Sequence, residues 1–320
     1  MSQAMQPEIA PVPVAPAADL GPKRRFYKRG GFRQSLWNAL GLSIFLVMIF
    51  PVYWMVTSAF KPARSIQKQP PDFIPKDWTL YNFSQAVHCK PGTTGAASGV
   101  ACQPGFWSAA GNSLIIVASV VGISLVIAFF AAAAVAKFRF FGRRPFIVLM
   151  VFIQLVPGIA LLLPIYLSFS TTFRGLNLLG HLSGVIVAYI VFSLPFMIWT
   201  LRGFIMNIPR DLEEAAMVDG ATELGAFIKI LLPLVAPGLV ATSIFAFISA
   251  WNEWIFAATI LRGNTQTLMM FLYGLGGGNQ GIPWGTIMAA STLISLPAVV
   301  FFMLVQRRVA FGLTAGAVRG

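Results

Sequence analysis

Six long apolar runs divide this sequence, and they limit the chain to a small set of folds. The hydrocarbon core of a bilayer is ~30 Å thick, and a helix that rises ~1.5 Å per residue crosses it in about 20 residues. Every run is long enough to do so. The predicted spans are residues 37–60, 113–136, 145–169, 182–201, 234–260 and 285–305. The predicted fold class is therefore all-α, a polytopic membrane protein with six transmembrane helices.

Composition and charge agree with a membrane protein. Of the 320 residues, 57% are hydrophobic and 10% are charged, whereas ordinary soluble domains carry about 25% charged residues. A net charge of +13 could also indicate a nucleic-acid partner. The basic residues, however, gather at the ends and between the apolar runs, which is typical of side chains that face lipid headgroups. We expect membrane lipid, and no nucleic acid, as a partner.

The distribution of Lys and Arg predicts the orientation. With the N-terminus inside, 16 of the 23 basic residues lie on the cytoplasmic side, as the positive-inside bias requires. Both termini and the loop 202–233 are then cytoplasmic, and the loop 61–108 is external. Residues 1–35 are predicted to be a disordered basic tail, 36–310 the membrane domain and 311–320 a C-terminal tail. The first apolar run is too long for a signal peptide and is expected to remain as an anchor.

The two cysteines, Cys89 and Cys102, both lie in the predicted external loop. A disulfide between them is chemically allowed outside the cytoplasm and would add about 3 kcal/mol of loop stability, but the sequence leaves open whether it forms. His88 is adjacent. Two Cys and one His lack a fourth ligand, so no metal site is expected.

Motifs for catalysis and nucleotide binding are absent from the sequence. It contains no G-x-x-x-x-G-K-S/T loop, no H-E-x-x-H and no G-x-S-x-G. We therefore expect no catalytic residues and no cofactor in this chain, and any ATP must be used by a partner. The Gly-rich run at 274–281 has no Lys and is predicted to be a flexible external loop.

An acidic helical hairpin is predicted in the cytoplasmic loop. Pro209 suits a first helical turn, and the acidic residues that follow it lie where the helix dipole favours anions. Gly220 can adopt the left-handed conformation that ends a helix. Thr222 can cap a second helix, which Pro233 and Pro237 are expected to disturb as the chain enters the membrane.

The same stretch carries a family resemblance. Glu214, Ala215 and Ala216 are followed by Gly220 and then by Ile230, Leu232 and Pro233. This spacing resembles the EAA loop of the membrane subunits of bacterial ABC importers. Other matching segments are NSLIIV from 112, LPFMIWTLRGF from 194, FISAWNEW from 247 and GLTAGAVRG from 312. Over residues 30 to 320 the chain resembles the carbohydrate-importing permeases of the maltose-transporter MalG type.

The resemblance implies a MetI-like permease fold in a bacterial inner membrane. In that family the EAA helix, called the coupling helix, docks in a cleft of a cytoplasmic ABC ATPase dimer, which holds ATP and Mg. A second permease subunit and an external sugar-binding protein are the other implied partners. The implied coupling residues are Glu213, Glu214, Ala215, Ala216, Asp219, Gly220, Ile230, Leu232 and Pro233.

Candidates for a solute path lie inside the predicted spans. Helices broken at membrane depth are tolerated where they line a cavity or are buried in protein, and polar or Pro residues interrupt the third and fourth spans. For the prolines alone, a kink packed against neighbouring helices is the preferred interpretation. Glu253 is the one acidic residue inside a predicted span, and it is either functional or a wet anchor at the interface. The candidate path residues are Gln154, Tyr166, Tyr189, Ser193, Trp251, Asn252 and Glu253.

The predicted function is that of a permease subunit that moves a sugar, a di- or oligosaccharide. The alternatives are an ABC permease for a polyamine, phosphate or amino acid, and a channel or ion-coupled transporter that acts alone. The last class should carry paired ionisable residues within its spans, and here only Glu253 is present.

Overall fold

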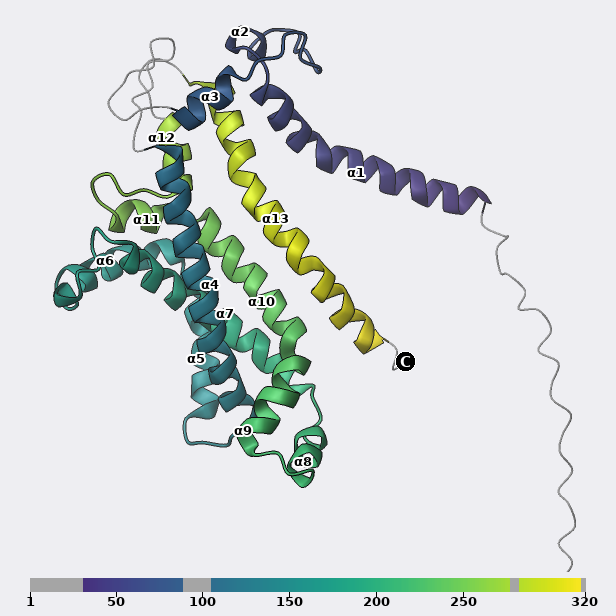
Figure 1. Ribbon diagram of the computed structural model, residues 1–320, viewed down its shortest axis with the longest axis vertical. Coiled ribbons are helices and arrows are strands. Elements are labelled where there is room, and N and C mark those ends of the chain that lie inside the picture. The colour runs from purple at the N-terminus through teal and green to yellow at the C-terminus, as the bar shows by residue number, and fades with distance from the viewer. Residues whose placement is uncertain (1–30, 89–104, 277–281, 318–320) are drawn as a thin grey trace, which may run out of the picture. The chain divides into compact units, whose positions relative to one another are not determined.

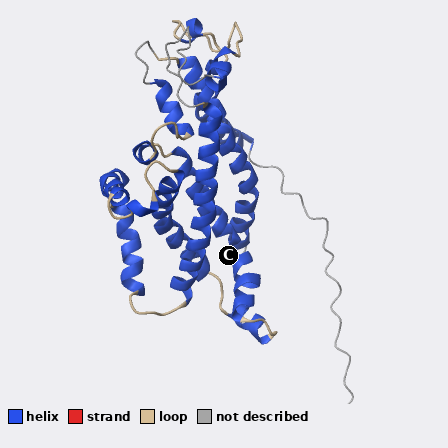
Figure 2. Cartoon of the chain, turned by 60° about the vertical axis from the view of Figure 1, so that its left-hand side comes forward, coloured by secondary structure: helices blue, strands red, loops and turns tan. Residues whose placement is uncertain are grey.

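The computed structural model describes residues 31–88, 105–276 and 282–317. Helices make up the regular structure of these residues, and no strand occurs among them (Figure 2). The chain separates into two compact units that meet after Pro51, and each is considered by itself. The described part of the first unit is the N-terminal portion of α1, and α1 spans Gly31–Ala59.

The second unit contains all the other elements, and Figure 1 labels its α-helices. The first of them are α2 (Ala63–Ile66), α3 (Tyr81–His88), α4 (Phe106–Lys137), α5 (Arg143–Leu155), η1 (Gly158–Leu161), α6 (Leu162–Ser170), η2 (Arg174–Leu176) and α7 (Leu182–Met206). The remainder are α8 (Asp211–Val218), α9 (Glu223–Ala226), the π-helix η3 (Phe227–Leu231), α10 (Leu232–Asn252), α11 (Ile255–Ile260), α12 (Leu268–Gly276) and α13 (Trp284–Ala317).

Five of the described helices are long and apolar enough to cross a membrane, and the bent pair α5 with η1–α6 makes a sixth if it counts as one span. α4, α7 and α10 pack against one another at the centre of the second unit (Figure 1). Small residues allow this close approach, as is usual between helices in membranes. Ala132, Ala133 and Ala136 are buried on α4, and Gly238 of α10 lies directly against the ring of Phe204.

The third predicted span is not one straight helix. α5 ends at Leu155, and the following η1–α6 segment is turned by 99°. Pro157 explains the break, because it has no N–H and it pushes Val156 into an extended conformation, with ψ 122°. In the fourth span α7 is continuous through Pro195, which agrees with a proline packed within the helix and not with an interrupted helix.

The fifth predicted span also needs correction. Residues 234–260 were expected to form one helix, but α10 ends at Asn252 and α11 begins at Ile255. Glu253 separates them in an extended conformation, with ψ 130°. At the other end of the chain, α13 continues to Ala317 and includes most of the segment predicted as a C-terminal tail.

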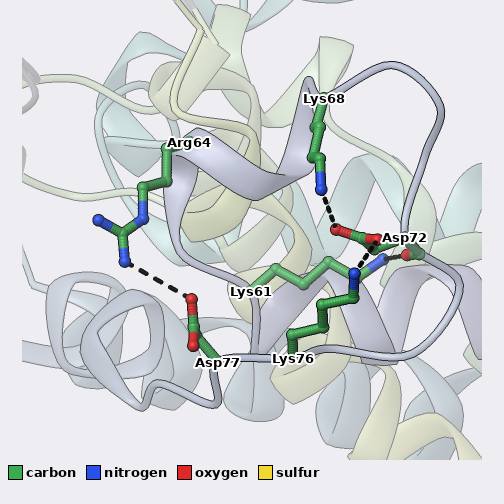
Figure 3. Close-up of polar contacts among 6 residues, drawn as sticks. All are labelled: Lys61, Arg64, Lys68, Asp72, Lys76 and Asp77. Carbon is green, nitrogen blue, oxygen red and sulfur yellow. Dashed lines mark hydrogen bonds and ion pairs between the residues drawn. The ribbon is translucent and has the colours of Figure 1, made fainter.

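The segment after α1 is ordered by a buried lysine. Lys61 is 1% exposed, lies over the Trp54 ring and donates a hydrogen bond to the carbonyl of Asp72. Burial lowers the pKa of the Lys61 ammonium, and the charge of Asp72 opposes that shift. Figure 3 shows the surrounding ion pairs, in which the Asp72 carboxylate meets both Lys68 and Lys76.

Candidate functional site: the cytoplasmic hairpin and a cavity between the central helices

The hairpin that the sequence predicts is formed by α8 and α9. α8 begins after Arg210, and its first turn contains Asp211, Glu213 and Glu214, where the helix dipole favours negative charge. No residue of α8 is buried. Its apolar side chains also face outward, including Val218, which is 87% exposed. The helix therefore presents a free surface with small residues, Ala215 and Ala216, beside carboxylates.

The turn after α8 is fixed by the backbone. Gly220 has φ +92°, which only glycine adopts without strain. The amide of Asp219 donates to the carbonyl of Ala215, which closes the end of the helix. Thr222 then caps α9 by accepting a hydrogen bond from the Gly225 amide at 3.1 Å. Both the turn and the cap lie where the sequence places them.

The hairpin continues into the membrane without a gap. Helical structure is unbroken from Glu223 to Asn252. The disturbance expected near Pro233 takes the form of the π-helix Phe227–Leu231, in which Ile230 is half-buried. Leu232 and Pro233 form the first residues of α10. α9 and α10 are therefore joined by continuous helical backbone.

An ion pair joins the hairpin to α4. Glu213 of α8 accepts a hydrogen bond from the ammonium of Lys137, the last residue of α4. Arg210 adds a second link, because its Nη2 donates to the Lys137 carbonyl at 3.1 Å. A groove of about 530 Å³ lies beside this pair, and Glu214 also lines it. The sequence did not reveal this link, because the partners lie 76 positions apart.

A second cavity, of about 360 Å³, lies between the central helices and the break in the third span. Gly158 and Ile159 line it together with Tyr189, Ser193 and Glu253. The Glu253 carboxylate is fully engaged there. It accepts hydrogen bonds from the Tyr189 hydroxyl at 2.6 Å and from the amides of Ile255 and Phe256.

The other path candidates do not line this cavity. The Tyr166 hydroxyl accepts a hydrogen bond from Arg262. Trp251 is buried and stacks on Phe247, while the side-chain amides of Asn252 and Gln154 donate to carbonyls of their own helices. Cys89 and Cys102 lie outside the described residues. Within the described ranges, no group of three His, Cys, Asp or Glu residues could hold a metal ion.

Comparison with known proteins identifies the family. Residues 124–314 match the family model described as "Binding-protein-dependent transport system inner membrane component". The chain belongs to this family. It is a multi-pass permease subunit of a transporter that works with a substrate-binding protein, and it is not itself an enzyme.

Curated relatives of this permease match along almost the whole chain. It is 38% identical to the diacetylchitobiose uptake system permease protein DasC of Streptomyces coelicolor, over 92% of this chain and 100% of that one. It is 33% identical to the trehalose transport system permease protein SugB of Mycobacterium tuberculosis, over 91% and 100%. A solved bacterial ABC transporter involved in alginate import has the same fold, with a TM-score of 0.69 at 23% identity over 88% of this chain and 98% of that chain.

Several residues of the cavity in this permease were missed from sequence. Its lining includes three phenylalanines, Phe192, Phe245 and Phe256, and Ser249. A usable signal exists in the spacing, because Phe245 and Ser249 lie four residues apart on one face of α10, and Glu253 follows at the same interval just after the helix ends. Counting back from Glu253 by this interval would have predicted Ser249 and Phe245 as cavity residues.

Proposed function

We propose that this permease moves a di- or oligosaccharide across the bacterial inner membrane with energy from a partner ATPase. The names of the relatives support the substrate class, since they include transporters of diacetylchitobiose, trehalose and maltose. The solute arrives on an external sugar-binding protein. A second permease subunit completes the membrane pathway, and a cytoplasmic ABC ATPase dimer holds the ATP and Mg. Both termini lie in the cytoplasm.

The exposed hairpin carries the proposal. α8 has no buried residue, is held at one end by the Lys137 pair and at the other by Gly220, and leads through α9 into α10. Ala215 and Ala216 allow a partner to approach closely, and the carboxylate of Glu214 faces outward for a basic residue of that partner. Closure of the ATPase would shift α8 as a rigid unit and move α10 with it. Alternating access then follows from the tilt of the central helices.

The cavity favours a neutral solute over a charged one. Glu253 is the one charged residue among its lining side chains, and its carboxylate already accepts hydrogen bonds from Tyr189 and two amides. A polyamine would find no free carboxylate there, and a phosphate or amino acid would find no Lys or Arg. Aromatic rings and hydroxyls, in contrast, suit the apolar faces and hydroxyl groups of a sugar.

The test uses the complete transporter reconstituted in liposomes with its binding protein and ATPase. Glu214→Lys and Gly220→Val are each expected to lower the rate of ATP-dependent sugar uptake by about tenfold or more, which corresponds to a rise of at least about 1.4 kcal/mol in the activation free energy. Gly220→Asn is the matched control, because Asn tolerates positive φ. Normal uptake by both variants would overturn the coupling role. Coupled uptake of a non-sugar solute alone would overturn only the substrate class.

A further inference from the structure

A small pocket at the cytoplasmic ends of α4 and α7 has a strongly basic lining. Its volume is about 290 Å³, and four of its lining residues are cationic: Lys137, Arg139, Arg143 and Arg210. Glu213 is the single carboxylate in the lining. The pocket lies beside the 530 Å³ groove next to the Lys137–Glu213 pair, and it is separate from the cavity between the central helices.

The carboxylate does not neutralise the pocket. Glu213 is already paired with Lys137, so three guanidinium groups remain without a carboxylate partner among the lining residues. The Nε atom of Arg143 is buried and has no hydrogen-bond partner in the described part of the chain. Its Nη2 reaches only the carbonyl of Ala136, at 3.4 Å. A buried donor of this kind is costly unless something accepts its hydrogen bond.

The loop beside the pocket has the character of a membrane interface. Between α4 and α5 the chain reads Phe138, Arg139, Phe140, Phe141 and Gly142, so three aromatic side chains surround one arginine. All three phenylalanines are exposed, and Phe141 is 104% exposed. Apolar rings next to arginines are typical of segments that lie at the headgroup level of a bilayer. This loop would therefore bring the pocket to the lipid surface.

The start of α5 adds to the positive field. Gly142 precedes the helix and gives no side-chain cap, and the first turn of α5 contains no acidic residue. The dipole of this 13-residue helix therefore points its positive end toward the basic loop. The positive end of the helix dipole adds to the positive field of the four cationic side chains, and it would not make an anion site by itself.

We propose that this pocket binds the phosphate of an anionic lipid headgroup, of the phosphatidylglycerol kind. Arginine guanidinium groups match phosphate oxygens in bidentate geometry, and basic pockets between transmembrane helices on the cytoplasmic side bind anionic headgroups. The exposed phenylalanines favour a lipid over a soluble phosphate ester, because acyl chains would cover their rings. The proposal needs the permease to lie in a membrane but does not depend on its solute.

The experiment measures retained lipid by native mass spectrometry of the full chain in detergent. Dioleoylphosphatidylglycerol is added at rising concentration, with dioleoylphosphatidylcholine as the zwitterionic comparison. The wild type is expected to retain the anionic lipid at least tenfold more strongly, and Arg139→Gln/Arg143→Gln is expected to lose that preference. Arg144→Gln is the matched control, because Arg144 is adjacent in sequence, is exposed and does not line the pocket. Arg139→Gln alone, at an exposed position, covers the case in which the double variant fails to fold.

The remaining arms identify the source of the phosphate. The lipid adduct should survive an excess of inorganic phosphate. If inorganic phosphate displaces the lipid and itself forms an adduct, and if the double variant lacks that adduct, the lipid assignment is overturned in favour of a soluble ligand. Equal retention by wild type and double variant would overturn the site itself. Loss of the adduct when the ATPase binds would show that a protein, not lipid, covers this surface in the working transporter.

Discussion

At the scale of single residues, Glu253 has a structural role that neither sequence-based interpretation included. An acidic residue in an apolar run suggests either a functional charge or an interfacial anchor. In the structure it closes α10 and caps α11, and the Tyr189 hydroxyl occupies one of its oxygens. The sequence could not reveal this role, because residues 234–260 were predicted as one helix, whereas α10 ends just before Glu253.

Removing this cap should destabilise the protein. Glu253→Ala is expected to lower the free energy of unfolding by about 2 kcal/mol, because two amides and the Tyr189 hydroxyl lose their acceptor. Glu253→Gln keeps one acceptor oxygen and should cost about 1 kcal/mol. Unfolding titrations in mixed micelles would measure both. Unchanged stability of Glu253→Ala, together with lost uptake in Glu253→Gln, would instead favour a direct role of the charge in transport.

A charge swap tests the link between α8 and α4. Lys137→Glu and Glu213→Lys should each reduce coupled uptake, and the double variant should recover most of it, because the half-buried pair is re-formed in reverse. We expect an interaction energy of about 1 kcal/mol from the double-mutant cycle. Lys137→Glu combined with Glu214→Lys serves as the control and should show no recovery. Additive losses in the swapped pair would mean that the two side chains act independently.

At the scale of elements, local rules predicted the hairpin and the break in the third span but not the packing between helices. Gly220, Thr222 and Pro157 each act on their own backbone, so their effects are visible in sequence. The contact between Gly238 and Phe204 joins α10 to α7, and nothing in the spacing of either helix indicates it. The end of α10 at Asn252 was also missed, and the Glu253 carboxylate that follows it is hydrogen-bonded to Tyr189 of α7.

Two glycine substitutions with opposite expected effects on stability test this helix contact. A Cβ at Gly238 would lie 2.6 Å from Cγ of Phe204, whereas a Cβ at Gly203, also helical, would meet nothing within 4 Å. Gly238→Ala should therefore destabilise the fold by about 1–3 kcal/mol through overpacking. Gly203→Ala should stabilise it by roughly 0.5–1 kcal/mol through helix propensity. Thermal unfolding in detergent compares the pair, and equal effects would show that the helices do not approach as closely.

The segment after α1, residues 60–81, should lose order in acid. Hydrogen bonding from Lys68, with the nearby charge of Lys76, holds the pKa of Asp72 below its ordinary value of 3.8. Because the folded-state pKa is the lower one, the stabilisation is complete above about pH 4 and is lost as pH falls through the folded value. Hydrogen exchange over residues 60–81 should accelerate in that window. Asp72→Asn should remove the pH dependence, while Asp77→Asn, in an exposed pair with Arg64, should leave it intact.

At the scale of the whole molecule, hydropathy predicted the number of crossings and the charge pattern predicted their direction. The first of these predictions agrees with five long helices and one bent pair. Hydropathy could not distinguish a straight span from a bent one, because both bury the same apolar residues. The direction of the crossings depends on how many basic residues together interact with the two sides of the membrane. It therefore needs a test that determines separately which side each face of the protein lies on.

Cysteine labelling supplies that test. In a background with Cys89→Ser and Cys102→Ser, Val218→Cys would report on the hairpin and Gln67→Cys on the segment after α1, and both positions are exposed. With the chain expressed without its ATPase, a membrane-impermeant maleimide should label Gln67→Cys in intact spheroplasts and Val218→Cys only in inside-out vesicles. The reverse pattern would place the basic loops outside and leave the hairpin unable to reach a cytoplasmic ATPase. The coupling role therefore requires this orientation, because a coupling helix works only on the side where ATP is hydrolysed.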